Sequence, residues 1–418
     1  MTVEKQPLDL VNRDDLIDLT QELVSIPSQY IENECIQHDE ITEYLAEYMD
    51  NMGLEVQFAD PEKDFPVIVG ATQDYGEGPT IGVLGHYSTV AIGDENDWSF
   101  DPLGGEVVDG NLYGRGSADQ KGGIAAALMA TQNLLESDVQ LNGQLKLIML
   151  PGEGSTQAGL GPAAKHHPDI INADAYIDSD SGPDRVSLAY GGLIWLELQT
   201  EGTPVHSGYV TDDGEVPINP AEKLIDVLSK IKTADWMEAE HHPLFGPESG
   251  RYTRDPIVDI NVVQAGDKVN QVPATATAQI DIRPLPSQTI EGVLEELDDV
   301  LEEMRTKDPD LEVETQIINA AKNDREVDQN APIVQLILET CEELDSPEPN
   351  LVGVSSSGRP ELTEFGPVIG FGAGGGNNVH AADEHIPVDR LVQGCKLHTL
   401  LYTKLMTHDA SSNLLDTQ

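Results

Sequence analysis

Short apolar runs alternate with segments of helical periodicity along the first part of the chain. Residues 13–26 and 37–53 carry apolar side chains at helical spacing, and Gly53 suits the C-cap that ends the second segment. Residues 122–137 predict a third, more apolar helix. The runs that predict buried strands are 79–85, 143–150 and 173–177. Strands alternating with helices predict an α/β fold, in which a mostly parallel sheet has helices on both faces.

The pattern changes at about residue 193, where apolar and polar residues begin to alternate with period two. Strands are predicted at 193–202, 256–266 and 274–286, and helices at 219–232 and 289–307. After residue 314 the first style returns, with a helix at 330–344, a strand at 366–374 and a helix at 388–406. We therefore expect a main domain formed by residues 1–192 and 315–418, interrupted by an inserted α+β domain at residues 193–314.

The charge of the chain excludes two classes of partner. Its 418 residues include 75 acidic and 23 basic side chains, which gives a net charge of -52. Such a charge disfavours binding to nucleic acid and to anionic membranes. The acidic residues are spread along the whole chain, which is typical of a protein from a salt-rich cytoplasm. Molar salt shortens the Debye length to about 3 Å and so relieves the repulsion between these charges.

Cysteine usage and hydropathy indicate a soluble, cytoplasmic protein. Cys35, Cys341 and Cys395 are too few for a disulfide framework, and no pair has zinc-binding spacing. The N-terminus lacks the basic start and apolar stretch of a secretion signal, and the chain has no run of about 18 apolar residues.

Histidines and carboxylates follow several of the predicted strands. Ligands in open α/β sheets gather at the carboxyl ends of the strands. Asp119 comes just before the helix at 122–137 and joins the same edge. Imidazoles and carboxylates together suit zinc or a similar divalent ion, with one carboxylate left over as a base. The residues that follow these strands, at the strand end or a few residues beyond it, are His86, Glu153, Asp178, Asp180 and His380.

Each of these residues also has a structural interpretation. A histidine at a strand end is commonly a structural residue, Asp119 suits a helix N-cap, and Asp178 and Asp180 suit a solvated turn. The glycine-rich stretch at 114–123 lacks the spacing of a phosphate-binding loop. The shared position of the candidates at one sheet edge is what favours a metal site.

Five motifs of the chain resemble one enzyme family, in the family's order and over nearly the whole length. They are GHYSTV, DPLGGEVVDGNLYGRGSADQKGGIAAAL, GTPVHSG, NQVPATATAQIDIRP and GFGAGGGNNVHAADEHIPVDRL. The family is that of the zinc-dependent amidohydrolases and exopeptidases, which includes acetylornithine deacetylase, succinyl-diaminopimelate desuccinylase, aminoacylase and glutamate carboxypeptidase. With its acidic composition, the chain resembles a haloarchaeal member. The resemblance implies a catalytic domain with two metal ions and an inserted domain that acts as lid and dimer interface.

The resemblance also implies roles for single residues. His86 matches a ligand of the first metal, Asp119 the bridging ligand, and His380 a ligand of the second metal. Asp180, less closely Asp178, matches the acid on the first metal. Glu153 matches the general base, which takes a proton from the attacking water and passes it to the leaving amine.

Three further matches lie outside the metal ligands. His206 matches a lid histidine that reaches a neighbouring subunit's site and stabilises the oxyanion. Asn270 matches a substrate-binding asparagine. Arg359 resembles the arginine that holds the substrate carboxylate, a task that suits its forked guanidinium.

The chain departs from the family pattern at three positions. Ser88 replaces an acid that steadies the first histidine, Gly154 replaces a ligand of the second metal, and Ser357 replaces an acid near the substrate arginine. Loss of such a supporting acid typically weakens metal affinity about 10- to 100-fold. Three hypotheses follow: the site works with one metal, it recruits another acid such as Asp178 or Asp383, or the chain binds a ligand without turnover.

The sequence thus predicts a metal-dependent hydrolase that cleaves an amide bond in a small N-acyl amino acid or short peptide and forms a homodimer. One or two divalent ions are expected, zinc first, with cobalt or manganese as alternatives. The competing hypothesis is a non-catalytic relative that binds a small carboxylate ligand or serves as an assembly partner. An aminopeptidase on a similar two-metal sheet is disfavoured by the inserted domain with its HSG motif.

Overall fold

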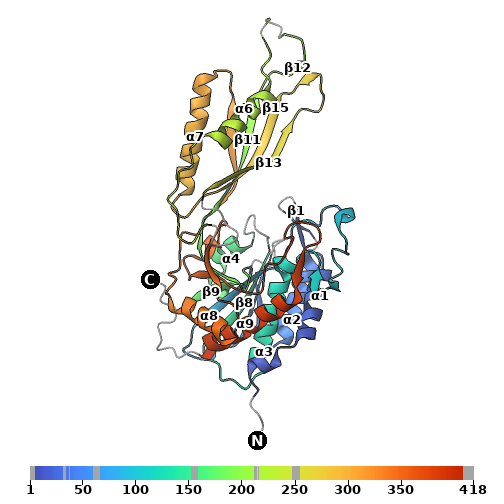
Figure 1. The fold of residues 1–418 in the computed structure, drawn as a ribbon, viewed down its shortest axis with the longest axis vertical. Helices are drawn as coiled ribbons and strands as arrows, with labels where there is room; N and C mark the ends of the chain where they lie inside the picture. Colours follow the sequence, from blue (N-terminus) through green and yellow to red (C-terminus); the bar gives the residue numbers. More distant parts are fainter. Residues whose placement is uncertain are drawn as a thin grey trace. The chain divides into compact units, whose positions relative to one another are not determined.

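The chain forms two compact units in a computed structural model, coloured along the sequence in Figure 1. The larger unit comprises Met1–Leu188, Arg325–Val352 and Glu361–Gln418, and the smaller comprises Ala189–Asp324 and Gly353–Pro360. The predicted boundary at residue 314 falls inside strand β16 (Val313–Ala321). The domain boundaries at residues 193 and 314 stay predictions. The structure describes residues 5–31, 34–36, 38–59, 66–151, 159–210, 214, 216–246 and 255–407.

An eight-stranded sheet forms the centre of the larger unit, in the order β17-β10-β18-β9-β5-β8-β4-β3. The four central strands, β18, β9, β5 and β8, run parallel to one another. Strands β10, β4 and β3 pair antiparallel. The predicted α/β fold is confirmed. The strands are β3 (Glu55–Ala59), β4 (Val67–Ala71), β5 (Thr80–His86), β8 (Gln144–Leu150), β9 (Ala175–Asp178), β10 (Arg185–Tyr190), β17 (Asn350–Val354) and β18 (Val368–Gly370).

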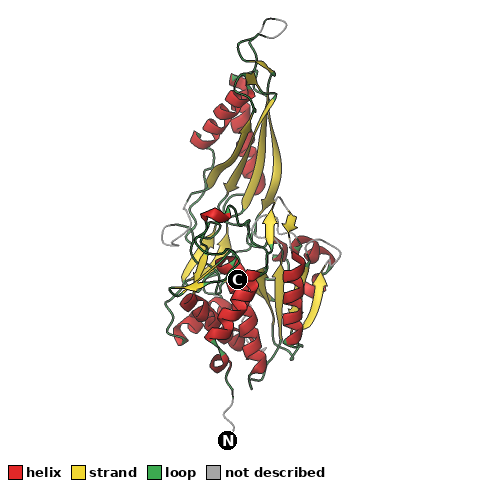
Figure 2. Ribbon diagram, turned by 90° about the vertical axis from the view of Figure 1, so that its right-hand side faces the viewer, coloured by secondary structure: helices red, strands yellow, loops and turns green. Residues whose placement is uncertain are grey.

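Helices cover both faces of this sheet, as the sequence predicts (Figure 2). On one face, a Cβ added to Gly85 would lie 2.8 Å from the Ile124 side chain of α3. On the other, Leu84 shares a core cluster with Leu160 and Ala163 of α4. Successive residues of β5 therefore bury opposite faces, which is why the strand is apolar throughout. The helices are α1 (Arg13–Ser25), α2 (His38–Asn51), α3 (Gly122–Glu136), α4 (Leu160–His166), α5 (Pro168–Ile171), α8 (Pro332–Glu343) and α9 (Val388–Thr407).

The smaller unit is an antiparallel sheet in the order β13-β15-β11-β16, with two helices on one side (Figure 2). Alternate residues of β11 and β15, among them Leu196 and Ile280, pack against helix residues such as Leu224 and Leu297. The elements are β11 (Leu193–Glu201), α6 (Pro220–Thr233), β13 (Ile257–Ala265), β15 (Thr275–Arg283) and α7 (Ile290–Lys307), besides β16. The three predicted strands are present as β11, β13 and β15, but the sheet has a fourth strand that the sequence pattern did not predict. Strand β16 was missed because it lies at the sheet edge with mostly exposed side chains and so lacks a clear apolar alternation.

Three small sheets complete the fold. They pair β1 (Gln29–Ile31) with β2 (Glu34–Ile36), β12 (Val205–His206) with β14 (Gln271–Val272), and β7 (Asn111–Tyr113) with both β6 (Val107–Val108) and β19 (His385–Pro387). The sheet of β12 and β14 carries the candidate site residue His206. Among the described residues, no helix combines the length and hydropathy that a membrane crossing requires.

Candidate metal centre

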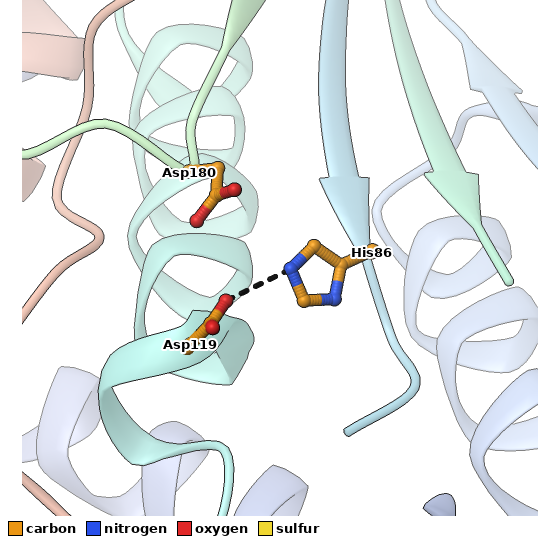
Figure 3. A group of neighbouring side chains, drawn as sticks. All are labelled: His86, Asp119 and Asp180. Atoms are coloured by element: carbon orange, nitrogen blue, oxygen red, sulfur yellow. Dashed lines mark hydrogen bonds and ion pairs between the residues drawn. The ribbon is translucent and has the colours of Figure 1, made fainter. Parts of the chain in front are cut away.

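Three predicted metal ligands meet at the carboxyl ends of the parallel strands (Figure 3). His86 is the last residue of β5, and Asp180 lies two residues beyond β9. Asp119 belongs to the turn Ser117–Lys121, which leads into α3. One potential ligand atom from each of the three side chains lies within 4.8 Å of the others. The structure thus places these three side chains at the sheet edge where the strand pattern predicts ligands.

His86 is held in the orientation that a metal ligand needs. Its side chain is 2% exposed, and its backbone N–H donates to Gln120 Oε1 at 3.2 Å. His86 Nδ1 lies 2.9 Å from the Ser88 carbonyl, which can only accept, so Nδ1 carries a proton. His86 Nε2 lies 3.0 Å from Asp119 Oδ1. A proton on Nε2, as in the imidazolium, or a metal ion held by both atoms satisfies this contact, so Nε2 is the ring nitrogen available to a metal.

Ser88 supports His86 through its backbone. The accepting atom is the Ser88 carbonyl, which any residue at this position supplies. The buried Ser88 hydroxyl has no hydrogen-bond partner within the described part of the chain. Replacement of the family's acid by serine therefore leaves the orientation of the imidazole intact.

Asp119 lies between two histidines. Its Oδ2 is 3.0 Å from His380 Nε2, while Oδ1 faces His86. Burial opposes ionisation, but hydrogen bonds from His380 and His86 and their positive charge outweigh it, so the pKa of Asp119 lies well below its usual range. The N-cap interpretation is wrong, because α3 begins at Gly122 and Lys121, two residues after Asp119, occupies its N-cap position without a side-chain capping hydrogen bond.

The second half of the centre is less complete. His380 lies on the loop between β18 and β19, with a φ of 64° and a side chain that is 51% exposed. Asp383 Oδ1 and Oδ2 accept hydrogen bonds from the backbone N–H and hydroxyl of Ser99, at 2.7 and 2.8 Å. Asp178 accepts from the backbone N–H of Asp180. Within the described ranges, the triad of His86, Asp119 and Asp180 is the one group of three potential ligands.

Close backbone approach explains the glycine-rich sequence before His380. A Cβ on Gly374 would lie 2.7 Å from the Ser179 carbonyl oxygen, beside Asp180. One on Gly376 would lie 2.4 Å from the His385 carbonyl oxygen and 2.7 Å from the Ala118 side chain. These contacts leave no room for side chains, so glycine lets this loop pack against the segments that carry Asp180 and Asp119.

A buried ion pair beneath Asp119 was missed by sequence reasoning. Arg115 Nη1 donates to Glu384 Oε2 at 2.6 Å, and the Glu384 side chain is 1% exposed. Burial and the negative charge of Asp119 raise the pKa of Glu384, while Arg115 opposes the shift. Both residues stand inside the family motifs, but their types alone do not distinguish them from surface charges of an acidic protein.

Three other predicted site residues belong to the smaller unit. His206 in β12 and Asn270 just before β14 are exposed neighbours, with Asn270 Nδ2 3.3 Å from His206 Nε2. The His206 ring also contacts the Tyr209 ring, with centroids 4.7 Å apart and an angle of 35° between the ring planes. Arg359 is 8% exposed, with a φ of 57°. Glu153 and Gly154 lie outside the described residues.

The model of peptidase family M20/M25/M40 matches residues 82–404. This span is more than half of the chain and contains all four predicted metal ligands. The chain belongs to peptidase family M20/M25/M40. The family that the motifs predicted is thereby confirmed for this M20 chain.

Individual relatives agree with this assignment. The M20 chain is 27% identical to succinyl-diaminopimelate desuccinylase of Wolbachia pipientis wMel, over 68% of this chain and 69% of the relative. It is 24% identical to N-formyl-4-amino-5-aminomethyl-2-methylpyrimidine deformylase of Bacillus subtilis, over 92% and 93%. The solved dipeptidase Dug1p of Saccharomyces cerevisiae superposes with a TM-score of 0.74 at 17% identity, over 95% and 97%. That last likeness concerns the fold.

The M20 chain is accordingly a metal-dependent amidohydrolase, as the sequence predicts. Its donor set fits the metal requirement of the family, because two carboxylates and an imidazole form the three-ligand set of a catalytic zinc site that keeps a further position open. The corresponding atoms of the triad lie within 4.8 Å of one another, close enough for the three side chains to hold one ion together.

Proposed function

We propose that this M20 chain hydrolyses the amide bond of a small N-acyl amino acid or short peptide with a free carboxylate. One observation carries the proposal: His86, Asp119 and Asp180 converge at the carboxyl edge of the sheet, and Asp119 is shared with His380. The names of the relatives support the substrate class, since desuccinylase, deformylase and dipeptidase all denote hydrolysis of an amide bond.

The triad of His86, Asp119 and Asp180 would hold a divalent ion, whose Lewis acidity would polarise a substrate carbonyl and make water more acidic. The chain's own residues do the rest. The Ser88 carbonyl fixes the His86 tautomer, and Asp119 stays ionised throughout the neutral pH range. Glu153 takes the proton of the attacking water and delivers it to the departing amine.

Residues of the smaller unit complete the proposed chemistry. We assign His206, with Asn270 beside it, to the oxyanion and the substrate backbone, in a site shared between two subunits. The support is that His206 is exposed on a short strand pair, so no core packing accounts for its imidazole. Arg359 holds the substrate carboxylate, and its scarcely exposed position favours a strong charge-assisted bond.

We favour a site that works with one tightly held metal. The support is that the described residues offer one complete triad, while Asp383 is already bonded to Ser99. A non-catalytic binding protein is the competing function. Its motivating observation is Gly154, which cannot ligate a metal through a side chain.

Turnover measurements decide between enzyme and binder. The purified chain in molar KCl is supplied with zinc and given N-acetyl amino acids, N-succinyl amino acids and dipeptides. We expect hydrolysis of at least one class, loss of it in Glu153→Gln, and no loss in His166→Ala, which changes an exposed histidine of α4. Zinc binding without hydrolysis of any class would support the binder instead.

The proposal also covers the oligomeric state of the chain and the salt concentration in which it works. We infer a homodimer formed through the inserted domain and a cytoplasmic location with concentrated salt, on the strength of the family resemblance and the net charge of -52. Light scattering coupled to gel filtration, in steps from 3 M to 0.1 M KCl, tests both. A dimer that dissociates or unfolds as salt falls is expected, since repulsion between acidic side chains is then unscreened. A monomer at 3 M KCl would contradict the homodimer, and a chain that stays folded, dimeric and active at 0.1 M KCl would contradict the adaptation to concentrated salt.

A further inference from the structure

Glu384 accepts four hydrogen bonds from the loop that carries Asp119. Its Oε1 accepts from the backbone N–H groups of Gly116, Ala118 and Asp119, each at 3.1 Å. Its Oε2 accepts from Arg115 Nη1 at 2.6 Å. Every donor comes from residues 115–119, so this short loop is wrapped around a single buried carboxylate.

The same residue connects the two metal-binding loops. Glu384 lies four residues after His380 and immediately before β19. Its carbonyl accepts from the backbone N–H of Gly114 at 2.9 Å, and His385 of β19 pairs with Tyr113 of β7. A displacement of Glu384 would therefore move the backbone of Asp119 relative to His380.

Arg115 makes this arrangement neutral and anchors it to a third segment. Its guanidinium carbon lies 5.0 Å from the ring centroid of Trp98, whose indole N–H donates to the Ile92 carbonyl. Because Arg115 balances the charge of Glu384, the pair adds no net charge beneath the ligands. Its effect on a bound metal is then exerted mainly through the position of Asp119.

We propose that Glu384 is a positioning residue that sets the metal affinity of the centre by fixing the backbone of Asp119, with Arg115 as its counterion. This inference rests on the proposed metal-dependent function. A carboxylate that accepts several backbone N–H bonds holds a loop in one conformation, and residues that orient ligands typically change metal affinity about 10- to 100-fold.

The test measures zinc affinity of metal-free protein in molar KCl by competition with a chromophoric chelator, together with thermal melting of the metal-free form. Glu384→Gln should weaken zinc binding about 10- to 100-fold, because the amide places N–H groups against donors. Glu384→Asp keeps the charge but withdraws it from the three N–H groups, so a smaller loss is expected. Glu384→Asp also keeps the test possible if Glu384→Gln does not fold. The matched control is Glu343→Gln, which removes the 2.8 Å ion pair with Lys404 between α8 and α9.

The outcomes separate this inference from the proposed function. Weaker zinc binding in the Glu384 variants, with unchanged affinity in Glu343→Gln, supports the positioning role. Wild-type affinity in a folded Glu384→Asp or Glu384→Gln variant overturns it and leaves the metal site standing. Absence of zinc binding in the wild type overturns the proposed function, and this inference with it.

Discussion

The two histidines on Asp119 differ in how firmly the fold holds them. His86 ends a central strand, is almost fully buried, and is fixed by Gln120 and the Ser88 carbonyl. His380 has the same 3.0 Å contact with Asp119, but it stands half-exposed on a loop with a positive φ. The two histidines therefore lie at equal distances from the Asp119 carboxylate, but the fold fixes His86 more firmly than His380.

This difference assigns different tasks to the two halves. A ligand whose orientation is fixed before binding loses little conformational freedom when the metal arrives, so the His86 half should bind first and tightly. The His380 half adds a ligand that must be ordered on binding, and its side lacks the acid that Gly154 replaces. The comparison explains how one metal could suffice.

The largest expected effect comes from removing His86. His86→Ala should weaken zinc affinity more than about 1000-fold, because it deletes one of three ligands of the buried triad. His380→Ala should cost at most about 10-fold. Isothermal titration of metal-free protein with zinc measures both, and equal losses in the two variants would remove the distinction between the halves.

The next largest effect is a loss of stability in acid, caused by a histidine that is buried without a carboxylate partner. His398 of α9 is fully buried, donates from Nε2 to the Phe371 carbonyl at 3.3 Å, and stacks on Tyr402. Burial lowers the pKa of His398 to about 4, so the unfolded chain binds a proton more readily as pH falls below 6.5. The free energy of unfolding should drop by roughly 2 to 3 kcal/mol between pH 7 and pH 4.5 from this group.

His398→Gln isolates that contribution, since the carboxylates titrate alike in both proteins. The difference in unfolding free energy between wild type and variant, measured by denaturant titration in molar salt, should shift in the variant's favour as pH falls. A difference that stays constant from pH 7 to pH 4.5 would show that His398 does not cause this acid sensitivity.

Restoring the missing acid should strengthen the weaker half. Gly154→Glu returns the residue type that the family uses on the second metal, so a second zinc ion should bind about 10- to 100-fold more tightly while the first is unaffected. Metal content after dialysis against low zinc measures the change. One zinc per chain in both proteins would mean that the His380 half needs more than this ligand.

The smallest effect is expected at Ser88. Ser88→Ala should change zinc affinity less than about twofold, because the His86 partner is a backbone carbonyl. The same titration checks this, and a tenfold loss would show that the hydroxyl takes part after all.

Apolar periodicity was sufficient to predict the buried elements. The apolar runs before His86 and up to Leu150 predicted strands β5 and β8, and similar patterns predicted β9, α3 and α9. These elements were predictable because their buried side chains are apolar and stand out in the sequence. The edge strand β16 was not predictable, because most of its side chains are exposed and its sequence shows no regular alternation of apolar and polar residues. The predicted ligands His86, Asp119 and Asp180 lie together in the structure, because the carboxyl ends of parallel strands and the start of the helix that follows meet at one sheet edge.

What supports the ligands could not be predicted in the same way. Glu384 and Arg115 matter because distant segments bury them together, and no local pattern distinguishes them among 75 acidic and 23 basic residues. At Ser88 the sequence drew attention to the side chain, whereas the contact that orients His86 is made by the main chain.

The most direct test titrates metal-free protein with zinc in molar KCl while amide hydrolysis is followed with the best substrate of the panel. The account predicts that turnover rises with the first equivalent of zinc per chain, that His380→Ala still reaches measurable turnover, and that His86→Ala gives none at the same zinc concentration. Turnover that is independent of zinc, or a His86→Ala variant as active as the wild type, would contradict it.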